Sequence, residues 1–240
     1  MRLNKYISET GVCSRREADK WIEAGRVTCN GQSAALGTQV AEGDEVRIDG
    51  ALIGVKKKPI YIALNKPVGI ICTTETHIKD NIIEHVGYKE RIFPVGRLDR
   101  DSEGLILLTN NGDIVNEILR SENNHEKEYV VSVDRPITDL SLSMMASGVK
   151  IMGERTKPAK VIRIDSQTFR IILTQGLNRQ IRRMCSALGY KARRLQRVRI
   201  MNIQLGKLAP GQWRHLTAPE LESLVPRRIP GARPAVAPSN

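Results

Sequence analysis

The sequence predicts an α+β protein: a small N-terminal domain, then a larger domain with a mixed, mostly antiparallel sheet and flanking helices. Three observations predict this fold. Helix caps and helical periodicity open the chain, short apolar runs bounded by turn residues recur between residues 60 and 205, and few helical segments lie among those runs. Residues 51–59 include three consecutive lysines and a proline that break any periodicity, so we expect a linker there.

Residues 1–50 predict two helices and then short strands, enough for a small separate domain. The first helix has apolar side chains on one face, and Gly11 ends it. The second begins at the capping box Ser14–Glu17 and is closed by Gly25. Short strands are expected beyond it, on either side of the Asn30–Gly31 turn.

The larger domain, residues 60–225, is predicted as a series of strands interrupted by short helices. Strands are expected at residues 60–64, 70–72, 105–109, 127–133, 161–165, 169–174 and 195–205, and residues 93–95 are expected to lead into the charged loop that follows them. Helices are expected at residues 81–86, 114–120, within 137–149, from 178 to 188 and at 218–224. Asp113 is expected to cap the second of these helices. Residues 226–240, rich in proline and arginine, are predicted to be disordered.

The net charge of +12 favours a polyanionic partner, and nucleic acid is the commonest one. Residues 1–50 carry seven basic and eight acidic side chains, whereas residues 179–199 carry eight basic and no acidic ones. Charge concentrated in this way suits a binding footprint better than general solubility. The residues expected to neutralise phosphates are Arg193, Arg194, Arg197 and Arg199.

The first segment also carries a specific residue pattern. It contains R-L-x-K-x-I, then G-x-x-S-R-R-x-A-x-x-x-I, then N-G and G-D, and it resembles the S-four (alpha-L) RNA-binding domain over nearly its whole length. Cys29 stands where that pattern usually has an aliphatic residue. A charged helix face is usually only solvated, but the resemblance implies RNA binding. The side chains expected to bind RNA here are Arg2, Lys5, Arg15 and Arg16.

Four further motifs follow in the larger domain. The loop Gly96–Gly104 packs two arginines and three carboxylates into seven residues and leads into an apolar strand. Taken alone it is an ordinary solvated turn or a catalytic loop at the edge of a scaffold. The others are L-N-K-P-x-G at Leu64–Gly69, K-x-Y at Lys127–Tyr129 and G-x-N-R-Q-I-R-R-M at Gly176–Met184. Taken in their order along the chain, the four motifs resemble those of the pseudouridine synthases of the RsuA type.

The resemblance implies an isomerase that converts a uridine in RNA to pseudouridine, with Asp99 as the catalytic residue. No cofactor is implied, because the bonds broken and made balance without redox change. Asp99 acts as a nucleophile at the sugar or as a base on a ribose proton, and the sequence leaves both open. Desolvation disfavours an ionised carboxylate, and a fixed guanidinium offsets that cost. We hypothesise that Arg182 is this partner.

The resemblance also gives roles to other side chains. Tyr129 would pack on the uracil ring and take the proton from carbon 5; otherwise it is an ordinary strand aromatic. Arg97 would help to flip the nucleotide or would contact a phosphate. Lys66 is either structural or close to the site. Arg179 and Arg183 share the polar side of their helix and are expected to bind RNA.

Segments His125–Thr138 and Gly176–Leu205 are most similar to the branch of this family that modifies large-subunit (23S) ribosomal RNA and can also act on a tyrosine tRNA. The expected partners are therefore ribosomal RNA and tRNA. No apolar run approaches membrane-spanning length, and the first residues lack a signal-peptide core. We expect a monomer in the cytoplasm with no membrane contact.

Two other functions compete with this prediction. A non-catalytic RNA-binding or ribosome-assembly factor would explain the N-terminal pattern and the charge. A metal-dependent nuclease would use Asp99, Asp101 and Glu103 as ligands. The four histidines fit no metal-ligand spacing, so no metal site is predicted. The four cysteines are scattered, and we expect them to be reduced thiols.

Overall fold

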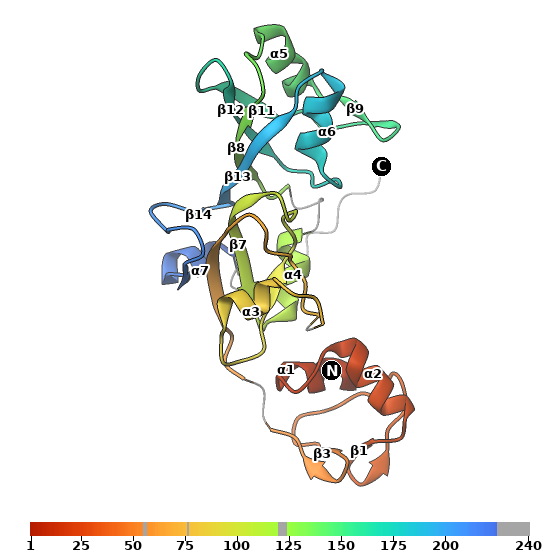
Figure 1. Ribbon diagram of the computed structural model, residues 1–240. Coiled ribbons are helices and arrows are strands. Elements are labelled where there is room, and N and C mark those ends of the chain that lie inside the picture. The colour runs from red at the N-terminus through yellow and green to blue at the C-terminus, as the bar shows by residue number, and fades with distance from the viewer. Residues whose placement is uncertain (55–56, 76, 120–123, 225–240) are drawn as a thin grey trace, which may run out of the picture.

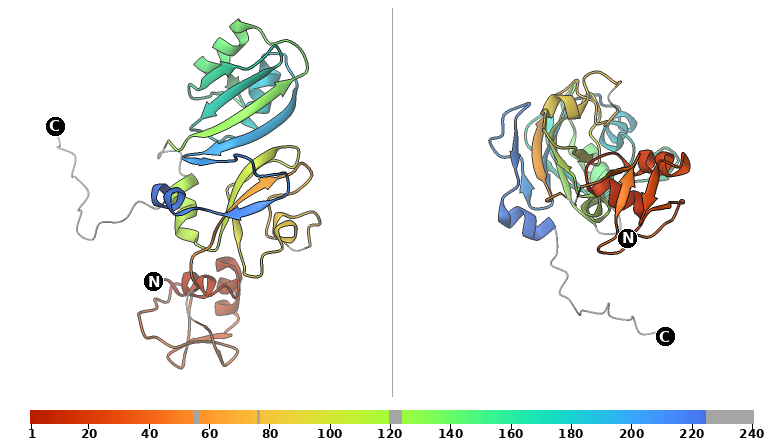
Figure 2. Two further views of the ribbon diagram at one scale, coloured as in Figure 1. Left: turned by 90° about the vertical axis from the view of Figure 1, so that its left-hand side faces the viewer. Right: turned by 90° about the horizontal axis from the view of Figure 1, so that it is seen from below.

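The computed structural model describes residues 1–54, 57–75, 77–119 and 124–224. The molecule is elongated: the N-terminal domain lies at one end, and the large sheet extends away from it (Figure 1, Figure 2). The predicted disordered tail, residues 226–240, lies outside the described residues. The described cysteines are all free thiols, as expected.

The N-terminal domain has two helices against a small antiparallel sheet. Its elements are α1 (Leu3–Glu9), α2 (Arg15–Glu23), β1 (Val27–Cys29), β2 (Gln32–Ser33), β3 (Val46–Ile48) and β4 (Ala51–Leu52), with strand order β2-β1-β3-β4. Ser14 caps α2 as predicted, because its Oγ accepts from the Glu17 N–H at 3.1 Å. Residues 51–53, predicted as linker, belong instead to this domain: β4 pairs with β3, and Ile53 packs on the core.

The larger domain is built on a sheet of nine strands. They are β5 (Tyr61–Lys66), β6 (Phe93–Val95), β7 (Glu103–Thr109), β8 (Lys127–Val133), β11 (Lys160–Arg163), β12 (Thr168–Leu173), β13 (Ala192–Ile200), β14 (Ile203–Gln204) and β15 (Trp213–His215). The order is β11-β12-β8-β13-β7-β5-β15, with β14 on β13 and β6 on β7. Among the strand pairs that the structure describes in this sheet, only β13 and β7 run parallel, so the predicted mixed, mostly antiparallel sheet is confirmed.

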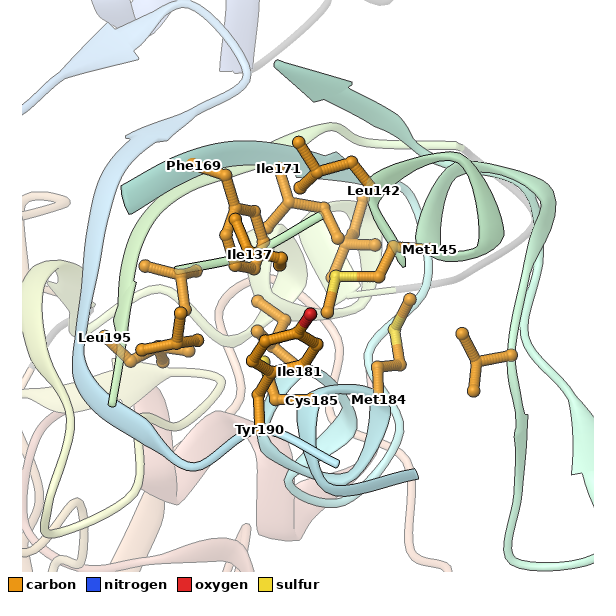
Figure 3. Close-up of a cluster of buried hydrophobic side chains, with 14 of the residues drawn as sticks. Ile137, Leu142, Met145, Phe169, Ile171, Ile181, Met184, Cys185, Tyr190 and Leu195 are labelled. Carbon is orange, nitrogen blue, oxygen red and sulfur yellow. The ribbon is translucent and has the colours of Figure 1, made fainter. Parts of the chain in front are cut away.

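Five helices cover the sheet: α3 (Ile82–Val86), α4 (Gly112–Leu119), α5 (Asp139–Ser147), α6 (Gln180–Ala187) and α7 (Ala218–Leu224). Strand residues alternate between faces, so α3 packs against Ile62 and Leu64, whereas α4 and α7 pack with Ala63 and Leu105. A third core lies under α5 and α6, around Phe169 and the other side chains of Figure 3. These cores hold the sheet rigid around the loops that follow its strands.

Several predicted boundaries shift. β5 continues through Lys66, past its expected end at residue 64, and the expected strand at residues 70–72 is only an isolated bridge. In addition to the predicted strands, β9 (Lys150–Ile151) and β10 (Glu154–Arg155) form a small hairpin. Asp113 does not cap α4: the helix begins at Gly112, and the Asn111 side chain accepts from the Asp113 N–H at 3.1 Å.

The parallel pair β7–β13 requires a glycine. Gly104 has φ +102 and lies opposite Arg197, and a Cβ built on it would come within 2.3 Å of the Arg197 carbonyl oxygen. Only glycine permits both this conformation and this approach. As a result, the loop that precedes β7 lies directly beside β13. This contact positions the charged loop singled out in the sequence.

Candidate active site

A pocket of about 580 Å³ opens beside the charged loop. Its walls come from the loop at residues 95–99, from β8 and β13, from the loop at residues 173–179 and from α6. The three side chains predicted as catalytic, Asp99, Tyr129 and Arg182, all line it. These residues are far apart in the sequence and come from three different elements, so the fold brings the predicted constellation together.

Lys66 holds the charged loop in place through hydrogen bonds to backbone carbonyls. This lysine is fully buried, and its Nζ donates to the carbonyl oxygens of Pro67 and Ser102, each at 2.8 Å. Burial lowers its pKa, while the loop carboxylates and the Cys72 thiol oppose this shift. Ser102 is also fully buried, and its N–H donates to the Asp99 carbonyl at 3.1 Å. Of the two roles considered for Lys66, its contacts are those of a structural residue.

The guanidinium nearest to Asp99 is not the one predicted. Arg179 Nη1 lies 3.5 Å from Asp99 Oδ2, and Arg179 also makes a two-point hydrogen bond to Asp101, with both distances 2.9 Å. Arg182 instead lies 3.4 Å from the Asp101 carboxylate through Nε, and its Nη atoms donate to the carbonyls of Ala192 and Asp101. The hydrogen bond from Arg179 lowers the pKa of Asp101, with Arg182 adding to the effect against burial.

Arg197 belongs to the pocket rather than to an outer phosphate-binding surface. It is 4% exposed, and its Nε donates to the Leu105 carbonyl at 2.6 Å. Its Nη1 lies 3.5 Å from the Tyr129 hydroxyl, and its guanidinium is 6.0 Å from the centre of that ring. Arg197 Nη2 is buried with no hydrogen-bond partner among the described residues. Arg197 therefore links β13 to β7 through its hydrogen bond to Leu105, and its guanidinium contacts Tyr129.

Lys127 was not selected from the sequence, yet it also lines the pocket. Burial lowers its pKa, and the positive charge of Arg197 lowers it further. Its Nζ donates to the His125 carbonyl at 3.2 Å. Lys127 is the first residue of the K-x-Y motif, from which only Tyr129 was predicted to belong to the site. Lys127 and Arg197 thus add two basic groups to the lining of the pocket, where a polar or anionic part of a substrate would be stabilised.

The other arginines predicted to bind RNA differ in whether a group of the protein already holds them. Arg97 lines the pocket and Arg193 is exposed, whereas the remaining three have partners within the chain. Arg183 donates to the Asn178 carbonyl and side chain, at 3.0 and 3.2 Å. Arg194 is exposed but paired with a carboxylate, Glu103. Arg199 is not available for a phosphate, because its half-buried guanidinium is held by two glutamates, Glu126 at 2.8 Å and Glu128 at 2.7 Å.

The basic residues of the N-terminal domain also divide. Arg2, Arg15 and Arg16 are exposed. Lys5, by contrast, reaches across to the larger domain, where its Nζ lies 2.6 Å from Asp113 Oδ1. This hydrogen bond raises the pKa of Lys5. Lys5 was predicted to contact RNA, but its partner here is a carboxylate of the same chain.

The carboxylates proposed as nuclease ligands face arginines. Asp99, Asp101 and Glu103 each lie within 3.5 Å of a guanidinium nitrogen. Within the described ranges, no group of three or more histidine, cysteine, aspartate or glutamate side chains could hold a metal ion. In the same ranges, no helix has the length and apolar character needed to cross a bilayer.

Comparison with known proteins agrees with the site. Residues 60–187 match the model of the RNA pseudouridylate synthase family, and residues 1–46 match the S4 domain. The chain is 56% identical over 225 residues to the dual-specificity RNA pseudouridine synthase RluF of Salmonella typhi, covering 93% of this chain and 78% of that one. It is 34% identical to the ribosomal small subunit pseudouridine synthase A of Yersinia pestis, covering 93% and 98%.

A solved structure gives the same result. The crystal structure of a pseudouridylate synthase superposes with a TM-score of 0.69 at 32% identity, covering 94% of this chain and 100% of that chain. The similarity predicted from the motifs is therefore confirmed in sequence and in fold. With an S4 domain followed by a matching catalytic domain, this chain belongs to the RNA pseudouridine synthase family of isomerases.

Proposed function

We propose that the protein isomerises one specific uridine to pseudouridine in large-subunit (23S) ribosomal RNA, with Asp99 as the catalytic residue. The observation that carries the proposal is the convergence of Asp99, Tyr129 and a cluster of arginines in one pocket. A pocket of about 580 Å³ is large enough for a single nucleotide. A base inside a helix cannot reach such a pocket, so the uridine must be flipped out of its stack.

The chemistry that follows is redox-neutral. The bond from ribose carbon 1′ to nitrogen 1 breaks, the base turns while bound, and carbon 5 joins carbon 1′. Carbon 5 loses its proton and nitrogen 1 gains one. Asp99 acts at the sugar, as nucleophile or as base, and Arg179 Nη1 lies 3.5 Å from its carboxylate. Tyr129 packs on the uracil and accepts the carbon 5 proton.

The choice of RNA rests on the relatives. Identity to the dual-specificity enzyme, 56%, far exceeds identity to the small-subunit enzyme, 34%. This difference counts against a small-subunit substrate, and the words dual-specificity in the first relative's name support a second RNA substrate. Large-subunit RNA and tyrosine tRNA are proposed for these two substrates from the resemblance of segments His125–Thr138 and Gly176–Leu205. The exposed Arg2, Arg15 and Arg16 support RNA binding by the N-terminal domain, residues 1–53 once its fourth strand is included.

The remaining expectations follow from this function. We also propose that the protein acts as a monomer. A substrate that is part of the ribosome places the protein in the cytoplasm. Arg97, at the pocket, would fill the space left by the flipped base or hold its phosphate. A non-catalytic assembly factor would need the N-terminal domain and the charge, but not the convergence of residues around Asp99.

The test is pseudouridine mapping on transcripts incubated with the protein. We expect one new pseudouridine in the 23S transcript, none in a 16S transcript and a second product in tyrosine tRNA. A single product in the 16S transcript would overturn the proposed substrate. Binding to the 23S transcript without any pseudouridine would favour the assembly factor.

A further inference from the structure

We propose that Asp101 is a positioning residue for the reaction, the middle member of a chain of alternating charges that runs from Arg182 through Asp101 and Arg179 to Asp99. The inference rests on the proposed function of the pocket, because it concerns how the charge of Asp99 is held in place. Asp101 itself does not line the pocket, whereas the other three residues do. Its effect must therefore pass through the two arginines.

The contact between Asp101 and Arg179 fixes the orientation of the guanidinium. Nη1 bonds to Oδ1 and Nη2 to Oδ2, both at 2.9 Å, which holds the plane of the guanidinium against the plane of the carboxylate. The same Nη1 lies 3.5 Å from Asp99 Oδ2, a single longer contact. Two short bonds outweigh one long contact, so Asp101 rather than Asp99 decides where Arg179 points.

Arg182 anchors the other end of the chain. Its side chain is 13% exposed, and its Nε lies 3.4 Å from Asp101 Oδ2. That Nε is buried and makes no hydrogen bond to any described residue. The negative charge of the Asp101 carboxylate therefore offsets part of the cost of burying it. Its Nη2 donates to the Asp101 carbonyl at 2.7 Å, and Nη1 donates to the Ala192 carbonyl at 3.0 Å. Asp101 thereby joins the charged loop to α6 and β13.

The backbone of Arg179 adds a second restraint. Arg179 precedes α6 with φ +49 and ψ 35, a left-handed conformation that few residues other than glycine adopt. Such a conformation persists where surrounding contacts determine it, and functional sites are where it is commonly found. The left-handed turn directs the Arg179 side chain back toward the charged loop, where Asp101 receives it.

Loss of the Asp101 charge has a distinctive expected signature. Asp101→Asn keeps the shape of the side chain but removes the carboxylate that separates two cations. Arg179 then loses its fixed place beside Asp99, so the chemical step slows. RNA affinity should stay the same or rise, because the protein becomes more positive by one charge. A variant that merely lost structure would lose rate and affinity together.

The experiment measures single-turnover tritium release from a 23S transcript labelled at uridine carbon 5, with RNA affinity measured in parallel. Asp101→Asn should lower the rate at least tenfold with affinity unchanged or tighter, and Asp101→Glu should recover part of the rate. Asp80→Asn is the matched control, because Asp80 also pairs with an arginine of the loop, Arg100 at 3.7 Å, but this arginine, unlike Arg179 and Arg182, does not line the pocket. We expect a rate within twofold of the parent.

A double variant tests whether the chain acts as a unit. Asp101→Asn combined with Arg179→Gln should be no slower than the slower single variant. Multiplicative losses, or an Asp101→Asn rate within twofold of the parent, would overturn the inference. An active Asp99→Asn variant would instead overturn the proposed function. If Asp99→Asn is inactive and Asp101→Asn is normal, only the positioning role of Asp101 fails.

Discussion

At the scale of the residue, Asp99 keeps 32% of its side chain exposed and, among the described residues, pairs with the guanidinium of Arg179. The motif order predicted that Asp99, Tyr129 and Arg182 would share a pocket, and they do. The prediction that Arg182 would stand beside Asp99 was wrong, because Arg179 lies there instead. Helical spacing alone places Arg182 toward the apolar face. The arginine that lies beside Asp99 is instead set by the left-handed backbone at Arg179, and the residue types of the motif do not predict that conformation.

Arg182 should carry more stability than its neighbour Arg183. Arg182→Leu leaves the carbonyls of Ala192 and Asp101 without their donors and removes a cation beside the Asp101 carboxylate. We expect a loss of about 1–3 kcal/mol in the free energy of unfolding, together with lower turnover. Urea denaturation measures the first quantity. Arg183→Leu, which removes bonds to Asn178 only, should change it by less than about 1 kcal/mol. Equal losses would show that the contacts of Arg182 add nothing.

At the scale of the element, the site depends on the one parallel pairing, β7 with β13. The sequence predicted both strands but could not predict that they pair, because partners are set by the whole sheet. It also missed β15, a three-residue strand with no run of apolar residues, which becomes a strand only by pairing with β5. Short edge strands depend on their neighbours rather than on their own pattern.

Gly104→Ala tests the β7–β13 contact. The added Cβ would meet the Arg197 carbonyl at 2.3 Å, and the backbone at φ +102 disfavours any side chain. We expect a loss of about 2–4 kcal/mol in the free energy of unfolding and strongly reduced activity. Gly54→Ala is the control, because nothing lies within 4 Å of its Cβ position. Thermal unfolding of both variants decides the point, and a Gly104→Ala protein as stable as the parent would contradict the described approach.

The last described helix, α7, is joined to β15 by an ion pair with a defined pH dependence. Two hydrogen bonds from Arg214, both 2.8 Å, lower the pKa of Glu220 to about 2 from 4.5, and the Thr217 N–H assists. The native carboxylate thus stays ionised where the unfolded chain takes up a proton. Its stabilisation is present above about pH 4.5 and is lost as the pH falls toward 2.

Glu220→Gln should therefore be less stable than the parent at pH 7, and the difference should shrink as the pH falls from about 5 to about 3. Urea midpoints of the two proteins across this range provide the measurement. A difference that stays constant with pH would mean that the charge of Glu220 makes no contribution.

At the scale of the whole molecule, an ion pair joins the N-terminal domain to the larger domain: Lys5 bonds to Asp113 at 2.6 Å. In the segment between the domains, Lys57 lies 3.5 Å from Glu90. The sequence separated the two domains and found a linker, but it could not predict that Lys5 would turn toward the larger domain. Exposed ion pairs contribute little stability, about 1 kcal/mol at most, so the orientation of the small domain is held weakly.

Asp113→Asn should loosen this orientation without changing the stability of either domain. Distances between labels on the two domains, measured by single-molecule energy transfer, should spread more widely in the variant than in the parent. Asp139→Asn is the control, because it breaks an exposed pair with Arg163 that lies inside the larger domain. Unchanged distances in Asp113→Asn would show that Lys5 does not hold the domains together.

The central claim is that one carboxylate, Asp99, performs the isomerisation. The most direct measurement compares the parent with Asp99→Asn for pseudouridine formed in a 23S transcript and for affinity toward that transcript. The variant should bind with the affinity of the parent and form no detectable pseudouridine. Product at the parental rate from a folded Asp99→Asn protein would contradict the claim.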